Sequence, residues 1–79
     1  MIPLYGFLEG DTLGLLMLAH ADMTLAELAQ QLRAAGRLRA DPGERVQLVF
    51  RGVSQDLRMT VAEAGLTALQ RFDVRGAVS

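Results

Sequence analysis

The sequence contains no cysteine, no tryptophan and no lysine among its 79 residues. Without cysteine, no disulfide can hold the fold and no thiolate can bind a metal ion. This absence is typical of a reducing compartment, so we expect a cytoplasmic protein. All eight basic residues are arginines. Codon bias in a GC-rich genome is the first interpretation, and an arginine-rich interface is the second.

A large excess of one charge is also lacking, because the formal net charge is -1. A general binder of nucleic acid or of an anionic membrane needs a concentrated basic face, so we expect neither partner. The apolar runs are too short to span a bilayer, and the segment 1–9 lacks the basic start of a signal peptide. We expect one domain, residues 1–79, with more apolar surface than its thin core can hide, since 51% of the residues are hydrophobic.

Residues that could carry catalysis are scarce. The single histidine, His20, lies at an expected strand end beside Asp22, where an exposed histidine more often has no site role. No cluster of metal-binding residues and no glycine-rich phosphate loop is evident. We therefore expect no catalytic residue, no cofactor and no metal on this chain.

Two apolar segments, 2–9 and 12–20, are separated by Gly10 and Asp11, which predicts a hairpin with a type II′ turn at those two residues. The turn sets a register with one aliphatic face and one partly aromatic face. The pairs expected on the aliphatic face are Leu8–Leu13, Gly6–Leu15, Leu4–Met17 and Ile2–Ala19. The pairs expected on the opposite face are Glu9–Thr12, Phe7–Gly14, Tyr5–Leu16 and Pro3–Leu18.

A capping box at Thr24 and Glu27 predicts the start of a helix, and Gly36 is its expected C-terminal glycine. The residues expected on its single apolar face are Leu25, Leu28, Ala29 and Leu32. The alternating segment 45–51 predicts a strand. A second capping box at Thr60 opens a short helix that Gly65 closes, and a last strand is expected over 69–75 with Phe72 and Val74 inward.

The order of hairpin, helix, strand, short helix and strand predicts an α+β fold of the β-grasp, or ubiquitin-like, type. We expect a mixed sheet of four to five strands with one main helix on one face. The helix should cover Leu13, Leu15 and Met17. The opposite sheet face is then left as the candidate partner interface, and the residues assigned to it are Tyr5, Phe7, Leu16, Leu18, Val49, Arg51 and Arg71.

Three stretches, GFLEGD (6–11), DMTLAELA (22–29) and above all MTVAEAGL (59–66), resemble the small B protein of the toluene and alkene monooxygenase systems. The resemblance covers nearly the whole chain in order. It implies a non-catalytic γ subunit that docks on the α subunit of a bacterial hydroxylase with two α, two β and two γ chains. It also implies a diiron centre in the α subunit, and a reductase, a Rieske ferredoxin and an effector protein as indirect partners. The chain itself has no Glu-x-x-His pair of the kind that holds two irons in a helical bundle.

Two alternatives share this fold. One is a stand-alone ubiquitin-like adaptor that docks through its sheet. The other is a ubiquitin-like modifier or sulfur carrier, which acts through a C-terminal Gly-Gly. The second is disfavoured because Gly76 is a single glycine followed by Ala77, Val78 and Ser79.

Overall fold

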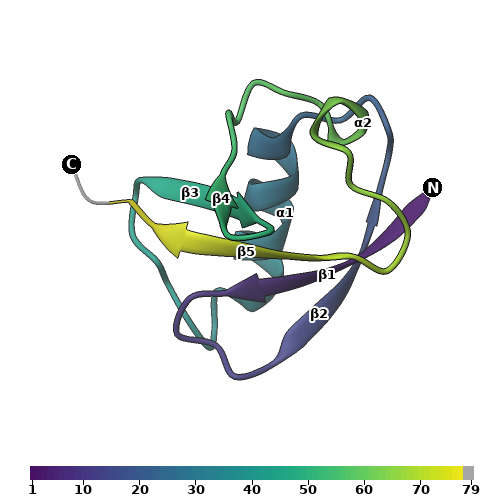
Figure 1. Ribbon diagram of the computed structural model, residues 1–79. Coiled ribbons are helices and arrows are strands. Elements are labelled where there is room, and N and C mark those ends of the chain that lie inside the picture. Colours follow the sequence, from purple (N-terminus) through teal and green to yellow (C-terminus); the bar gives the residue numbers. More distant parts are fainter. Residues whose placement is uncertain (78–79) are drawn as a thin grey trace.

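The computed structural model describes residues 1–77 and shows a five-stranded mixed sheet with one long helix behind it (Figure 1). The elements are β1 (Ile2–Leu8), β2 (Gly14–Ala19), α1 (Leu25–Gly36), β3 (Val46–Phe50), β4 (Val53–Ser54), α2 (Val61–Ala64) and β5 (Arg71–Gly76). The strand order is β2-β1-β5-β3-β4, with β1 and β5 parallel and β2 and β4 at the two edges. The predicted β-grasp fold is confirmed. The expected tail after Gly76 includes Val78 and Ser79, which lie outside the described residues.

The first hairpin has the predicted register from Ile2 to Phe7, but the expected pairs Leu8–Leu13 and Glu9–Thr12 are not part of the ladder. The β1–β2 ladder runs from Ile2 opposite Ala19 to Phe7 opposite Gly14. Because side chains alternate between the two faces of a strand, this register determines which hydrophobic residues meet the helix. Leu4, Leu8 and Met17 are buried, and Leu15 packs against their cluster while partly exposed.

The turn of this hairpin is not the expected one. The Asp11 N–H donates to the Leu8 carbonyl oxygen at 2.9 Å, so Glu9 and Gly10 are the central residues and Gly10 has a φ of 89°. A positive φ at the third residue is typical of a type II turn. The longer loop also makes one core prediction wrong, because Leu13 is 54% exposed. The Asp11 carboxylate accepts the Leu13 N–H at 3.1 Å and holds that residue in the loop, before β2 begins.

Helix α1 begins where its capping box predicts. The Thr24 hydroxyl accepts the Glu27 N–H, and the Glu27 carboxylate accepts the Thr24 N–H, both at 3.2 Å. The helix ends at Gly36, as predicted, but not through a left-handed glycine, because the next residue, Arg37, is right-handed with a φ of -59°. Gly36 is also a close-packing residue, because a Cβ there would lie 2.9 Å from Leu8 Cδ2.

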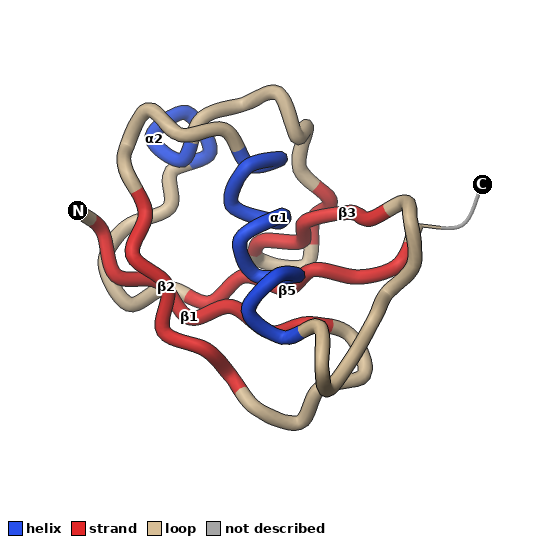
Figure 2. Tube along the Cα trace, turned by 180° about the vertical axis from the view of Figure 1, so that it is seen from behind, coloured by secondary structure: helices blue, strands red, loops and turns tan. Residues whose placement is uncertain are grey.

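The core lies between α1 and the inner face of the sheet, and Figure 2 shows α1 crossing that face. The most completely buried large side chains are Leu4, Leu25, Leu28, Leu32, Leu48, Val61, Phe72 and Val74. They include the helix leucines and both β5 residues predicted to point inward. Gly6 also lies on this face, where a Cβ would approach Phe72 Cζ to 2.8 Å.

The second half of the chain contains one hairpin that was not predicted. β3 ends at Phe50, and Arg51 and Gly52 connect it to β4 with φ values of 55° and 77°. Two central residues with positive φ are typical of a type I′ turn. The last strand begins at Arg71, later than expected, because Leu69 has a φ of 66° and is excluded from the ladder.

The short helix α2 follows the prediction at both ends. Thr60 and Glu63 form its capping box, and Gly65 ends it in the left-handed conformation with a φ of 78°. Within the described part of the chain, no helix is long and apolar enough to cross a membrane.

Candidate partner interface

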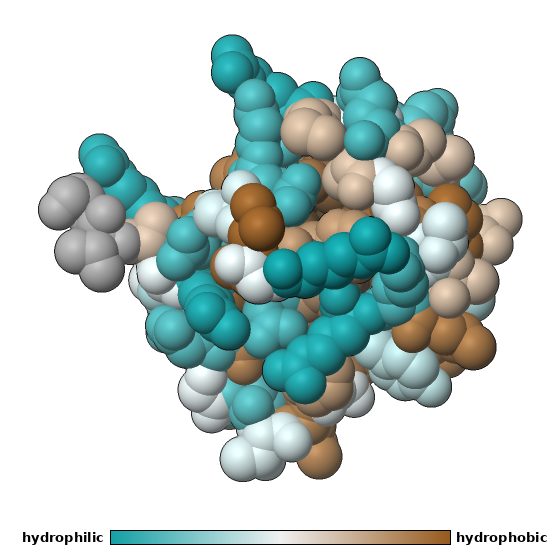
Figure 3. Space-filling model, in the orientation of Figure 1, coloured by the Kyte–Doolittle hydropathy of each residue, from teal (hydrophilic) through white to brown (hydrophobic). Residues whose placement is uncertain are grey.

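The outer face of the sheet, opposite α1, has two chemically different halves. Side chains of β1 and β2 form the apolar half, defined by Tyr5, Leu16 and Leu18. Side chains around β3 and β5 form the charged half, defined by Arg51, Arg71, Asp73 and Arg75. Figure 3, seen from the same side as Figure 1, shows hydrophilic side chains across the centre of this face and hydrophobic ones toward the lower right.

The apolar half follows directly from the hairpin register. Tyr5 lies opposite Leu16, and Pro3 lies opposite Leu18, so the four side chains share one patch. Leu16 and Leu18 are 59% and 55% exposed, and Tyr5 is 42% exposed. Grouped apolar exposure of this kind typically marks a contact site for another molecule.

Phe7 joins the two halves. Its ring lies over Gly14 of β2, where an added Cβ would be 2.5 Å from Phe7 Cζ. On β5, the Arg71 Cζ lies 4.0 Å from the centroid of the same ring, a cation–π contact. Phe7 is therefore half-buried between β2 and β5, and the Arg71 guanidinium is held close to the apolar half.

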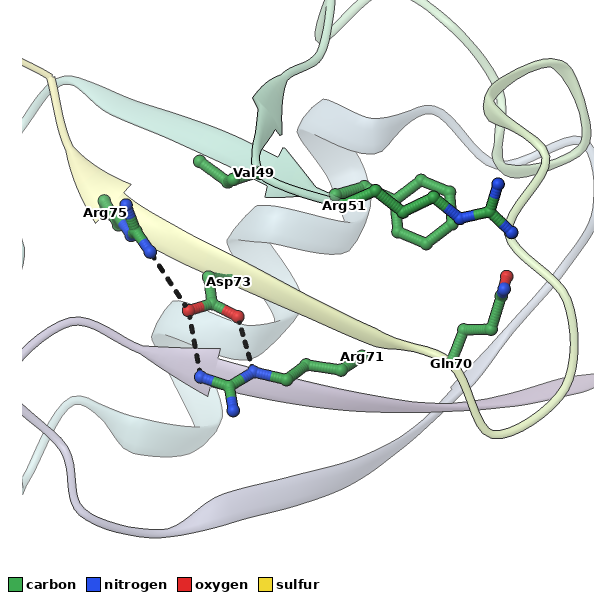
Figure 4. Close-up of a pocket in the computed structure, with 8 residues that line it drawn as sticks. Val49, Arg51, Gln70, Arg71, Asp73 and Arg75 are labelled. Carbon is green, nitrogen blue, oxygen red and sulfur yellow. Dashed lines mark hydrogen bonds and ion pairs between the residues drawn. The ribbon is translucent and has the colours of Figure 1, made fainter.

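The charged half is organised around Asp73. Arg71 donates to its carboxylate twice, from Nε to Oδ1 at 2.9 Å and from Nη2 to Oδ2 at 3.2 Å, and Arg75 Nη2 lies 3.6 Å from Oδ2 (Figure 4). These hydrogen bonds, chiefly those from Arg71, lower the pKa of Asp73, and partial burial opposes them. The three side chains occupy alternate positions of β5, which is why they share one face.

A shallow hollow lies beside this cluster, between the end of β3 and β5 (Figure 4). Val49 lies opposite Asp73 in the β3–β5 ladder and is only 9% exposed. Arg51, at the turn after β3, places its Cζ 5.0 Å from the centroid of the Phe50 ring. The residues that line the hollow are Val49, Phe50, Arg51, Gly52, Gln70, Arg71, Asp73 and Arg75.

The structure thus brings the seven residues assigned to the interface onto or around one face, although Val49 is largely covered. Sequence reasoning omitted Asp73, Arg75 and Gln70. The signal for Asp73 and Arg75 was present, because they alternate with Arg71 along one strand. No comparable signal exists for Gln70, which precedes β5.

The groups on this face can form contacts with another surface. Among residues 1–77, no three His, Cys, Asp or Glu side chains are grouped so that they could hold a metal ion. His20 is exposed at the end of β2, away from the charged half. Guanidinium groups, one carboxylate and an apolar patch can bind another surface, but they do not form a nucleophile with its base.

Comparisons with known proteins bear on the fold and the family of this chain. The chain is similar to a chain of the structure described as toluene 4-monooxygenase HD complex with the inhibitor 4-bromobenzoate, with a TM-score of 0.87 and 21% identity, covering 96% of this chain and 98% of that chain. It is also similar to Caldiarchaeum subterraneum ubiquitin, with a TM-score of 0.79 and 13% identity over 99% of this chain and 95% of that one.

A computationally designed protein based on human erythrocytic ubiquitin gives a TM-score of 0.75 and 25% identity over 100% of this chain and 95% of the design. No curated protein sequence gives a significant match. The family model for toluene-4-monooxygenase system protein B (TmoB) matches residues 1–75. Because that match spans nearly the whole sequence, the chain belongs to the TmoB family, the small protein B component of a monooxygenase system.

Proposed function

We propose that the chain is the non-catalytic γ subunit of the hydroxylase component of a bacterial multicomponent diiron monooxygenase that oxidises aromatic or alkene hydrocarbons. Family membership over residues 1–75 is the observation that carries this proposal. The fold likeness to a chain of a toluene 4-monooxygenase complex supports it. In the proposed assembly, two copies join two α and two β chains, and the reductase, Rieske ferredoxin and effector protein act on the whole.

In this proposal the diiron centre belongs to the α subunit. The described residues of the small chain do not fit such a centre, since they provide no group of carboxylates and histidines that could bind a metal ion. Its sheet and its 12-residue helix also differ from the bundle of helices that supplies carboxylate and histidine ligands to two irons. The contribution of this chain is therefore a contact surface.

We propose that the apolar half of the outer face packs against the α subunit. Tyr5, Leu16 and Leu18 stand together on a face that α1 does not cover, whereas the most exposed leucine, Leu38, is separate, in the segment after α1. An apolar patch covered by a partner releases water from both surfaces, which favours association.

Substitution of Leu16 tests this proposal. The full chain would be produced together with the α and β chains of its host, and the amount of γ chain that co-purifies with them would be measured. Leu16→Asp should lower that amount strongly, because the contact would desolvate an unpaired carboxylate. Leu38→Asp, which places the same charge at a position 93% exposed, should co-purify like the unsubstituted chain.

Circular dichroism of both purified variants provides the folding control. Since the Leu16 side chain already points away from the core, both variants should retain the native spectrum. Equal co-purification of the two folded variants would contradict docking through the apolar half. Failure of the unsubstituted chain to join α and β would contradict the γ-subunit assignment itself.

A further inference from the structure

We infer that the charged half of the outer face receives an acidic segment of the large subunit, and that this contact sets the orientation of the small chain on its partner. This inference rests on the proposed function. Three observations support it. The hollow beside β5 contains more arginines than carboxylates, the guanidinium groups of these arginines are held in place, and the charged half is continuous with the apolar half.

The charge of the hollow is opposite in sign to that of the whole chain. Arg51, Arg71 and Arg75 line it together with a single carboxylate, Asp73, although the formal net charge of the protein is -1. Positive charge is therefore concentrated on one small area. Such an area attracts a negatively charged partner and repels a positively charged one.

Asp73 does not use all the N–H donors of the arginines around it. Asp73 receives two hydrogen bonds from Arg71 and lies 3.6 Å from Arg75 Nη2. Each guanidinium carries five N–H donors, so both arginines retain donors for further acceptors. Among residues 1–77, Arg51 forms no ion pair with an acidic side chain. Additional carboxylates can therefore bind here without displacing Asp73.

These arginines are also held in place before any partner arrives. The Arg71 guanidinium is fixed by Asp73 and by the Phe7 ring, and that of Arg51 lies over the Phe50 ring. A side chain that is already ordered loses less conformational entropy on binding. Arginine donors match the two oxygens of a carboxylate, so an acidic protein segment suits these groups well.

The apolar half identifies the kind of partner. Because Phe7 contacts both Gly14 and Arg71, the apolar and charged halves form one continuous surface that a single protein can cover. A nucleic acid would use the arginines but would leave Leu16 and Leu18 in water. In the complex, burial of the apolar half favours association. Pairing of the charged half with the acidic segment favours one orientation of the small chain on its partner over others.

Charge reversal tests the inference in the intact complex. Arg51→Glu and Arg75→Glu chains would compete with labelled unsubstituted chain for the α and β subunits, at low and at high salt. Each reversal should weaken binding by about tenfold or more at low salt, and the difference should shrink at high salt, where charge interactions are screened. Arg37→Glu, at the end of α1 on the opposite face of the sheet, should bind like the unsubstituted chain.

The outcomes separate this inference from the proposed function. If Leu16→Asp releases the chain while both reversals bind normally, the γ-subunit assignment stands and the acidic contact is refuted. If the unsubstituted chain does not join α and β, the proposed function fails first. Tight binding of a single-stranded oligonucleotide that Arg75→Glu abolishes, with no change in subunit binding, would also overturn the inference.

Discussion

Asp73 shows how one residue organises its surroundings on the outer sheet face. Its carboxylate lies between the guanidinium groups of Arg71 and Arg75, and its side chain is 18% exposed. The two hydrogen bonds from Arg71 are the main reason that its pKa lies below the ordinary value of 3.8. A carboxylate whose pKa is lower in the folded than in the unfolded chain stabilises the fold whenever it is ionised.

This lowered pKa predicts a defined dependence of stability on pH. The stabilisation from Asp73 should be complete above the ordinary pKa and should be lost as the pH falls through the lower, folded-state pKa. Asp73→Asn should therefore be less stable than the unsubstituted chain at pH 7, and the difference should narrow between about pH 5 and pH 2.

Urea unfolding of both chains across that pH range measures the effect. Glu44→Gln is the matched control, because Glu44 is an exposed carboxylate in the segment before β3. A gap between the Asp73 variant and the unsubstituted chain that stays constant from pH 7 to pH 2 would show that the Arg71 contact does not stabilise the fold.

Single residues also mark where sequence reasoning was limited. Leu13 matches the hydrophobic pattern of the strand but lies in a loop, because the hydrogen bond from its N–H to Asp11 keeps it out of the ladder. Gly36 ends α1 as the pattern predicts, but without the left-handed conformation, and the pattern did not show that Leu8 packs against it. Both outcomes depend on neighbours that a local pattern does not include.

At the scale of elements, local signals were the most reliable. The two capping boxes, the α1 stripe and the hairpin register were predicted because each depends on residues a few positions apart or on a strict alternation. The β3–β4 hairpin was missed because Arg51 and Gly52 do not match the usual Asn-Gly signature of a type I′ turn. The outer face was predicted as a surface, but the contact between Arg71 and the Phe7 ring depends on the parallel β1–β5 pairing, which joins strands far apart in the sequence.

For the elements, we predict the effect of a substitution on the apolar face of helix α1. Leu28 lies in the middle of its apolar stripe and is 0% exposed. Leu28→Ala should lower the free energy of unfolding by about 2 to 5 kcal/mol, because it removes buried methyl groups and leaves a cavity. Such a loss is large beside the roughly 5 to 15 kcal/mol that stabilises a typical protein.

Thermal denaturation of the purified chains measures this loss. Gln31→Ala is the control, since Gln31 is an exposed residue of the same helix. Its melting temperature should barely change, whereas that of Leu28→Ala should fall by many degrees. Similar melting temperatures for the two variants would mean that Leu28 on the apolar face of α1 does not stabilise the packing of the helix on the sheet.

The whole molecule combines a covered and an uncovered sheet face. α1 packs on the inner face, and nothing in residues 1–77 packs as a second layer on the outer face (Figure 1). One half of that face offers apolar area and the other offers ordered charge. This division fits the proposed function, in which the inner face is covered by the chain's own helix and the outer face by a larger subunit.

The edge strand β2 adds a prediction for the isolated chain. The Tyr5 N–H donates to the Gln70 carbonyl, so the backbone groups of Leu4 point to β2 and pair with Met17. By alternation, the backbone groups of Leu16 and Leu18 point outward from the edge. β2 has no charge, no proline and no bulge, the features that normally prevent an edge from pairing with another chain.

We therefore expect the purified chain to self-associate as its concentration rises, and Leu18→Lys to reduce that association. Leu38→Lys, distant from β2 in the sequence, should not reduce it. Analytical ultracentrifugation over a range of concentrations measures both effects. A chain that stays monomeric at millimolar concentration would show that the edge does not pair.

The exposed edge of β2 has a consequence for how the protein is made. Copies that outnumber their partner chains would present the same unprotected strand to one another, and misassembly grows with every unpartnered molecule. A cell avoids this when the small chain is synthesised in step with the large one and captured early. In the proposed assembly, the six residues of β2 therefore favour synthesis of the small chain in step with its partner chains.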